Sequence, residues 1–169
     1  MACGGRPRHP EPSERTRTEV ASAEAALRRR DYDGARAGYA RAIASAPDGA
    51  SEAYARRELA DMLILVDERQ AAADELTRVT ALRPDDPATW HDLGIVRHSL
   101  GDIDGAAVAL GKAKALAPAD ARPRIALAAL LWERGDKPAA KQEYEQLLEL
   151  DLPPRLRDKV QWAIGELSR

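Results

Sequence analysis

Cysteine, phenylalanine and long apolar runs are scarce or absent in this sequence of 169 residues. The single cysteine, Cys3, excludes an internal disulfide and a cysteine-rich zinc site. No apolar run reaches the roughly 18–20 residues that a membrane-spanning helix needs. The net charge of -2 lacks the excess of positive charge with which proteins usually bind nucleic acid. Three classes therefore fall away: disulfide scaffolds, proteins that span a membrane within these residues, and nucleic-acid-binding proteins.

Alanine, leucine and charged residues dominate what remains, and charged side chains make up 32% of the chain. A mixture of Ala, Leu, Glu and Arg favours long helices over sheet. The length fits one domain that can bury a real core. We therefore expect an all-α fold.

The chain divides into a tail and a body. Residues 1–15 hold three prolines and two glycines without a helical apolar stripe, which predicts a flexible N-terminal tether. Residues 16–169 are predicted to form helices of about a dozen residues, because Asp, Gly and Pro recur between them as caps and stops.

Small residues recur in this body at a nearly fixed interval, which is 37 residues once and then 34 residues twice. They are Ala35, Ala72, Ala106 and Ala140. A bulky side chain follows each of them four positions later: Tyr39, Leu76, Leu110 and Tyr144. A small residue precedes each by twelve positions: Ala23, Ala60, Gly94 and Ala128. Twelve positions after each comes Pro47, Pro84, Pro118 and finally Leu152.

This order of small, large and proline positions resembles the tetratricopeptide repeat (TPR) family, and residues 87–120 match it best. The resemblance implies a right-handed α-solenoid of four helix–turn–helix repeats with a C-terminal capping helix. The repeats are expected at 16–52, 53–86, 87–120 and 121–153, and the capping helix at 154–168. Copy one departs from the pattern, with Ser22 in place of leucine and three extra residues at 50–52. Such departures are common in terminal repeats.

The stretch TWHDLGIVRHSLGD, residues 89–102, raises the question of chemistry because it holds two histidines and two aspartates. His91 and His98 are two helical turns apart, which is too far for one metal ion. The resemblance makes Trp90 a packing residue, and Asp102 is expected to be a turn residue. No serine or cysteine stands in a nucleophile context, so we predict no enzyme, no metal and no cofactor.

The first helices of successive TPR repeats line a concave groove, and the resemblance assigns ten residues of copies two to four to it as partner-binding positions. They are Tyr54, Arg57, Asp61, Ile64, His91, Ile95, His98, Arg122, Ile125 and Trp132. A solvated face without a ligand is the alternative, but several of these side chains are costly to leave in water. We therefore expect a protein partner, held as a peptide or helix segment, with Tyr54 and Trp132 as anchors.

Two features narrow the kind of partner and surface. Glu24 and Glu58 occupy positions at which relatives that hold acidic C-termini of chaperones carry a Lys and Asn clamp, so that role is rejected. Trp162, off the apolar stripe of the capping helix, is read as edge packing, with a contact site as the alternative.

The sequence around Cys3 is similar to the junction at which bacterial lipoproteins are cleaved and acylated. A lipid anchor on Cys3 requires an apolar signal segment upstream, and only Met1 and Ala2 precede this cysteine. If Cys3 carries this lipid anchor, the resemblance implies an assembly factor for a pilus or secretion complex. It would be held at the periplasmic face of a bacterial membrane, specifically the outer membrane. The alternatives are a soluble cytoplasmic adaptor and a structural subunit that uses its convex or edge surface.

Overall fold

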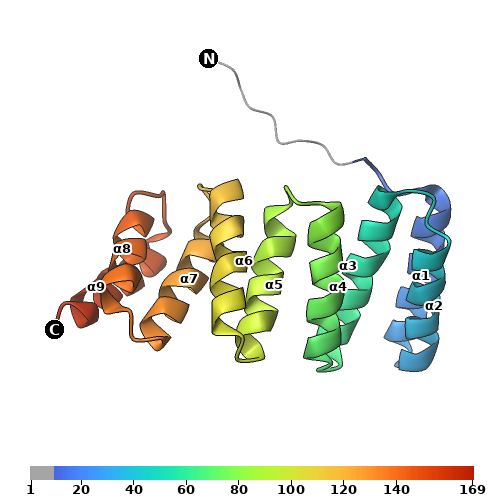
Figure 1. Cartoon of the computed structure of the whole chain (residues 1–169), viewed down its shortest axis with the longest axis horizontal. Helices are drawn as coiled ribbons and strands as arrows, with labels where there is room; N and C mark the ends of the chain where they lie inside the picture. The colour runs from blue at the N-terminus through green and yellow to red at the C-terminus, as the bar shows by residue number, and fades with distance from the viewer. Residues whose placement is uncertain (1–9) are drawn as a thin grey trace, which may run out of the picture. The chain divides into compact units, whose positions relative to one another are not determined.

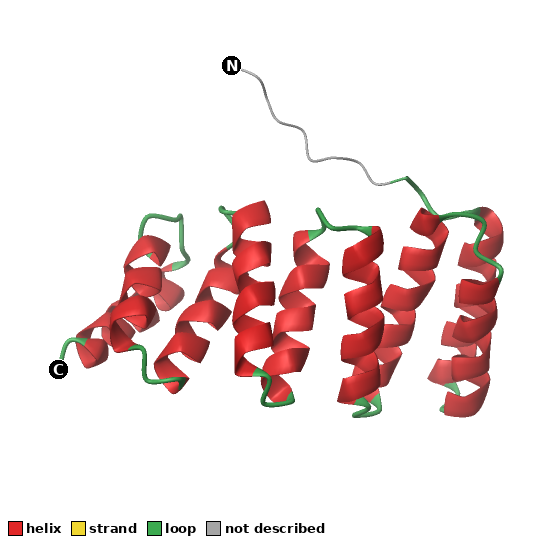
Figure 2. Ribbon diagram, in the orientation of Figure 1, coloured by secondary structure: helices red, strands yellow, loops and turns green. Residues whose placement is uncertain are grey.

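The computed structural model of the chain describes residues 10–169, which form nine α-helices and no strand (Figure 2). The helices are α1 (Glu14–Arg28), α2 (Tyr32–Ala44), α3 (Gly49–Leu65), α4 (Arg69–Leu82), α5 (Pro87–Ser99), α6 (Ile103–Leu116), α7 (Ala121–Glu133), α8 (Lys137–Leu147) and α9 (Pro154–Leu167). They belong to two compact units, an N-terminal unit ending at Pro84 and a C-terminal unit beginning at Asp85. The predicted all-α class with four helix pairs and a cap is confirmed over these residues.

Aspartate side chains begin most of the helices. Six helices, α2, α3, α5, α6, α7 and α8, start after an aspartate whose carboxylate accepts a hydrogen bond of 2.8–3.2 Å from a backbone N–H of the first turn. These bonds satisfy donors that a helix start otherwise leaves without a partner. Asp102, predicted as a turn residue, is one of these caps, because it accepts from the backbone N–H of Gly105 at 2.9 Å.

A left-handed residue ends the first helix of every pair. The φ angles are 62° at Arg30, 63° at Asp67, 79° at Gly101 and 86° at Gly135. Glycine adopts this conformation freely, whereas a residue with a Cβ is strained in it. The same backbone turn therefore recurs at the 37- and 34-residue intervals of the repeat, even where glycine is missing.

Small residues let the two helices of each pair approach closely, as the repeat pattern predicts (Figure 1). Ala35, Ala72, Ala106 and Ala140 are all fully buried. A Cβ added to Gly94 would lie 2.6 Å from Cγ of Leu110, and one added to Gly38 would lie 2.7 Å from Cβ of Ala23. The close contact of α5 with α6 and of α1 with α2 thus depends on glycine.

Two predicted boundaries differ from the structure. The tether was expected to reach residue 15, but α1 begins at Glu14 because Ser13 caps it: its Oγ accepts from the backbone N–H of Thr16 at 3.1 Å. The backbone N–H of Ser13 also donates to Oγ of Ser51 at 2.9 Å. Residues 50–52 were expected before copy two, but they form the first turn of α3, because Asp48 caps that helix.

The C-terminal unit has a core of its own around α9. A cluster of buried residues joins α7, α8 and α9 through Ala128, Tyr144, Leu147, Val160 and Ala163. The helix α9 therefore covers the last pair, as a capping helix is expected to do. Within residues 10–169, no helix is both long enough and apolar enough to cross a membrane.

Candidate partner-binding site

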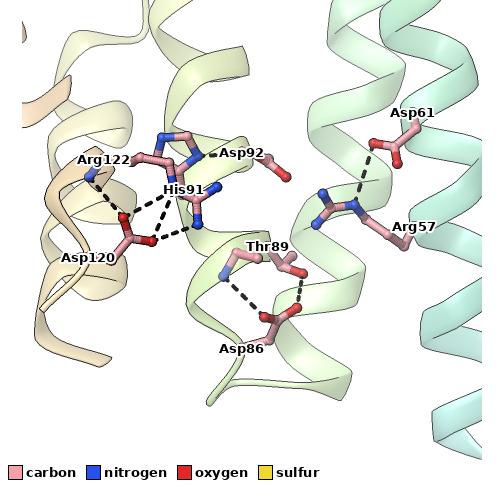
Figure 3. A network of polar contacts seen from close by, with 9 residues as sticks. Arg57, Asp61, Asp86, Thr89, His91, Asp92, Asp120 and Arg122 are labelled. Carbon is pink, nitrogen blue, oxygen red and sulfur yellow. Dashed lines mark hydrogen bonds and ion pairs between the residues drawn. The ribbon is translucent and has the colours of Figure 1, made fainter. Parts of the chain in front are cut away.

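In the N-terminal unit, α3 carries the predicted site residues of copy two. Tyr54 and Arg57 are half-buried, while Asp61 is exposed. Ile64 keeps 40% of its surface exposed. Arg57 and Asp61 form an i,i+4 pair, with Nε 3.5 Å from Oδ1 (Figure 3). The face of α3 thus combines an exposed apolar side chain with a fixed pair of charges.

Three carboxylates gather beside these residues and form what we call the acidic cluster: Glu24 of α1 with Glu58 and Asp61 of α3. Burial raises the pKa of Glu58, and the charges of Asp61 and Glu24 raise it further. Burial also raises the pKa of Tyr39, a residue of α2, to about 12, and Glu24 and Glu58 add to this shift. The pKa of Tyr54 is raised for the same reasons. Two tyrosine hydroxyls therefore lie within the electrostatic reach of the cluster.

In the C-terminal unit, the two histidines of α5 have different partners. Nδ1 of His91 lies 3.0 Å from Oδ1 of Asp92 (Figure 3). Nε2 of His98 lies 2.6 Å from Oε2 of Glu133 at the end of α7. The two rings do not converge on one point, and no cluster of three or more potential metal ligands occurs among residues 10–169.

The start of α7 presents a charged pair on the same unit. The guanidinium of Arg122 donates to Asp120, with Nη2 2.7 Å from Oδ2 (Figure 3). This hydrogen bond lowers the pKa of Asp120, and the nearby charge of His91 lowers it further. Arg122 is thereby held close to the residue that caps its own helix. Ile95, which lies between His91 and His98 in the sequence of α5, keeps 42% of its surface exposed.

Ile125 and Trp132 have packing partners as well as a predicted binding role. Both lie partly buried against the core cluster around α9. The Trp132 ring lies edge-on to Tyr144 with centroids 6.3 Å apart, and its centroid is 6.2 Å from that of Trp162. Trp162, 63% exposed, is thus in contact with the last pair, as its edge-packing interpretation predicts. Trp132 is at least in part a structural residue, so removing it as a test of binding would also disturb the fold.

A surface pocket of about 340 Å³ in the C-terminal unit is lined by Ile103, Asp104, Glu133 and Arg134. It contains none of the predicted binding residues. The ten predicted partner-binding residues do not include Glu24, Glu58 or Tyr39. Glu24 is a groove position of copy one by the family resemblance, and both acids also argue against an acidic ligand. The sequence spacing does not indicate that their charges act on Tyr39 of α2.

Solved structures show the same fold. A tetratricopeptide repeat protein from Parabacteroides merdae ATCC 43184 aligns with 92% of this chain and 61% of its own length, at a TM-score of 0.80 and 12% identity. MamA aligns with 79% of this chain and 77% of its own length, at a TM-score of 0.69 and 24% identity. The Yersinia enterocolitica type III secretion chaperone SycD was solved in complex with a peptide of the translocator YopD. It aligns with 67% of this chain and 89% of its own length, at a TM-score of 0.62 and 17% identity. No protein-family model and no curated protein matches the chain.

The chain therefore has the TPR fold. The helix pairs, the small residues at their contacts and these structural neighbours agree on this point.

Proposed function

We propose that this protein is a non-catalytic scaffold that binds a segment of a partner protein on the first helices of its TPR pairs. The observation that carries the proposal is the exposure of Ile64 on α3 and Ile95 on α5, each beside charged groups. Covering the exposed 40% and 42% of two isoleucines would contribute about 0.6–1.2 kcal/mol each. An apolar anchor surrounded by charges is typical of a surface that recognises a peptide or a helix.

The structural neighbours support a peptide ligand. SycD has this fold and is seen in complex with a peptide of YopD. That observation concerns SycD itself, and its identity with this chain is 17%. It supports the idea that helix pairs of this kind offer a face for a short segment of another protein.

The test compares matched substitutions of exposed aliphatic residues. Ile64→Ser and Ile95→Ser each remove an apolar side chain from a first helix, while Val108→Ser removes one that is 61% exposed on the second helix α6. None of the three is a core residue, so all variants should keep wild-type helix content. Tagged proteins are expressed in the native cell and their bound proteins are quantified by mass spectrometry.

We expect the two isoleucine variants to lose the partner that the wild type recovers, and Val108→Ser to retain it. Loss of the partner only with Val108→Ser would favour the alternative in which the opposite surface is used. If all three variants recover the partner as well as the wild type does, the exposed isoleucines do not bind it, and the proposal loses the observation that carries it.

The finer part of the proposal concerns location. A lipid on Cys3, which lies outside the described residues, would hold the scaffold at the periplasmic face of a bacterial membrane, where it would serve the assembly of a pilus or secretion complex. The sequence similarity around Cys3 supports this version. The alternative is the same scaffold without a lipid, acting in the cytoplasm.

A further inference from the structure

The N-terminal end of the sequence carries a proline motif that the proposed function does not use. Pro7 and Pro10 stand in the order P-x-x-P within residues 7–10, PRHP, and Pro12 follows. Segments with this spacing favour the polyproline II helix, and proteins recognise them by packing the prolines into grooves lined with aromatic side chains. Residues 7–9 lie outside the described residues, and the motif is therefore known from its sequence.

The C-terminal unit holds a pair of tryptophan rings at its surface. The centroids of Trp132 and Trp162 are 6.2 Å apart, and the two ring planes are inclined by 35°. Trp162 is 63% exposed, and Trp132 is half-buried. The indole N–H of Trp162 donates no hydrogen bond to any residue from 10 to 169, so this donor is left to water or to a ligand. We call these two residues the tryptophan pair.

The tryptophan pair extends the exposed face of α7 onto α9. Helix α9 packs on α8 as α7 packs on α6 (Figure 1). The buried positions of the two helices correspond at an offset of 33 residues: Leu127 and Leu130 of α7, and Val160 and Ala163 of α9. At this offset Trp162 takes the place of Ala129, an exposed residue of α7 three positions before Trp132. The two indole rings therefore belong to one surface of the last helices.

A proline motif fits the geometry of the tryptophan pair. A polyproline II helix has three residues per turn and rises about 3.1 Å per residue, so Pro7 and Pro10 would lie on one side of it, about 9 Å apart. This spacing exceeds the 6.2 Å between the ring centroids by less than the length of an indole, so each pyrrolidine ring can pack on one indole. The backbone carbonyls of such a helix have no internal hydrogen bonds, and one of them can accept from the indole N–H of Trp162.

We propose that residues 7–10 of one copy bind the tryptophan pair of a second copy. Ser13, which follows Pro12, is held in the N-terminal unit, because its backbone N–H donates to Oγ of Ser51 at 2.9 Å. The motif and the tryptophan pair thus belong to different units, and a second copy can present the motif whatever the arrangement of these units. Each copy has one motif and one tryptophan pair, so the contact is head-to-tail and leads to a ring or an open chain of copies. The inference goes beyond the proposed function, because the ligand is the chain itself.

The test is photo-crosslinking between two isotopic forms of the purified full chain. A photoreactive amino acid replaces His9, which stands between the two prolines. Protein with natural isotopes is mixed with an equal amount of protein labelled with heavy nitrogen, the mixture is irradiated, and mass spectrometry identifies the crosslinked peptides. Position 9 should crosslink to α7 or α9 beside the tryptophan pair. Roughly half of these crosslinks should join one peptide of each label, as random pairing of copies requires.

Matched variants locate the contact. Trp162→Ala, and Pro7→Ala combined with Pro10→Ala, should each lower the yield of this crosslink at least about fivefold, because each removes one side of the stacked contact. Val108→Ala removes another exposed apolar side chain of the same unit, and Pro12→Ala removes a proline outside the P-x-x-P spacing. Both controls should keep the yield, and circular dichroism verifies that all variants fold.

The outcomes distinguish this inference from its alternatives. Crosslinks confined to one label would place the motif on its own chain and contradict the inference. An unchanged yield with Trp162→Ala or with the double proline variant would contradict it as well, and so would the absence of any crosslink to α7 or α9. None of these results touches the proposed function, which Ile64→Ser and Ile95→Ser test separately.

Discussion

Replacing Gly94 with alanine should destabilise the protein, although alanine is the better helix former. In the middle of a helix, Gly to Ala normally stabilises by about 0.5–1 kcal/mol. At Gly94 the new Cβ would lie 2.6 Å and 2.9 Å from two carbons of Leu110 and 3.3 Å from the backbone oxygen of Ala106. Leu110 is itself buried and cannot move freely, so overpacking should cost about 1–3 kcal/mol.

Gly111 provides the matched control in the same unit. It lies inside α6, and a Cβ added to it would meet nothing within 4 Å. Gly111→Ala should therefore show the full helical gain, and the two variants should differ by about 1–3 kcal/mol in the free energy of unfolding. Urea unfolding followed by circular dichroism measures this difference at an unchanged m-value. If Gly94→Ala is as stable as Gly111→Ala, α5 and α6 do not approach each other as closely as described.

Four further results are expected. Ser13→Ala should lower the free energy of unfolding by about 1 kcal/mol in urea unfolding, because it removes the cap of α1. Trp132→Ala should lower it by about 2 kcal/mol or more, and Trp162→Ala by clearly less, because only the first ring is packed against the core around α9; equal effects would contradict that packing. The pKa of Glu58 is raised on folding, so its charged form destabilises the folded protein above the folded pKa, and this effect disappears below the unfolded pKa. Glu58→Gln should therefore stabilise the protein at pH 7. Thermal melts taken at progressively lower pH should show this gain shrinking. Intact mass measurement of the native protein should show acyl chains on Cys3 if the membrane version of the proposal holds, and a free thiol would exclude it.

The repeat pattern predicted the fold because close helix contacts leave a direct trace in the sequence. Ala106 and Gly94 are small where two backbones meet, and both are buried in the structure. The starts of copies three and four, at residues 87 and 121, coincide with the first residues of α5 and α7. The helix that carries copy two begins before the predicted start at residue 53, because Asp48 caps it and residues 50–52 belong to its first turn.

The site was harder to predict because its character depends on contacts between helices. Trp132 is predicted to be a binding anchor, but it also packs edge-on against Tyr144 of α8 and against the core cluster around α9, which are formed by later parts of the chain. The acidic cluster likewise joins residues of α1 and α3 with Tyr39 of α2. Helical periodicity gives the face on which each residue lies, but it does not show which residues of the other helices that face meets after folding.

The most direct test of the central claim, that partners bind on the first helices, is photo-crosslinking in the native cell. A photoreactive amino acid is placed at Ile64, Ile95 or Val108, three exposed positions of similar chemistry on α3, α5 and α6. The account predicts a crosslinked partner protein from Ile64 and Ile95 and none from Val108. A crosslink formed at Val108 but at neither isoleucine would contradict it.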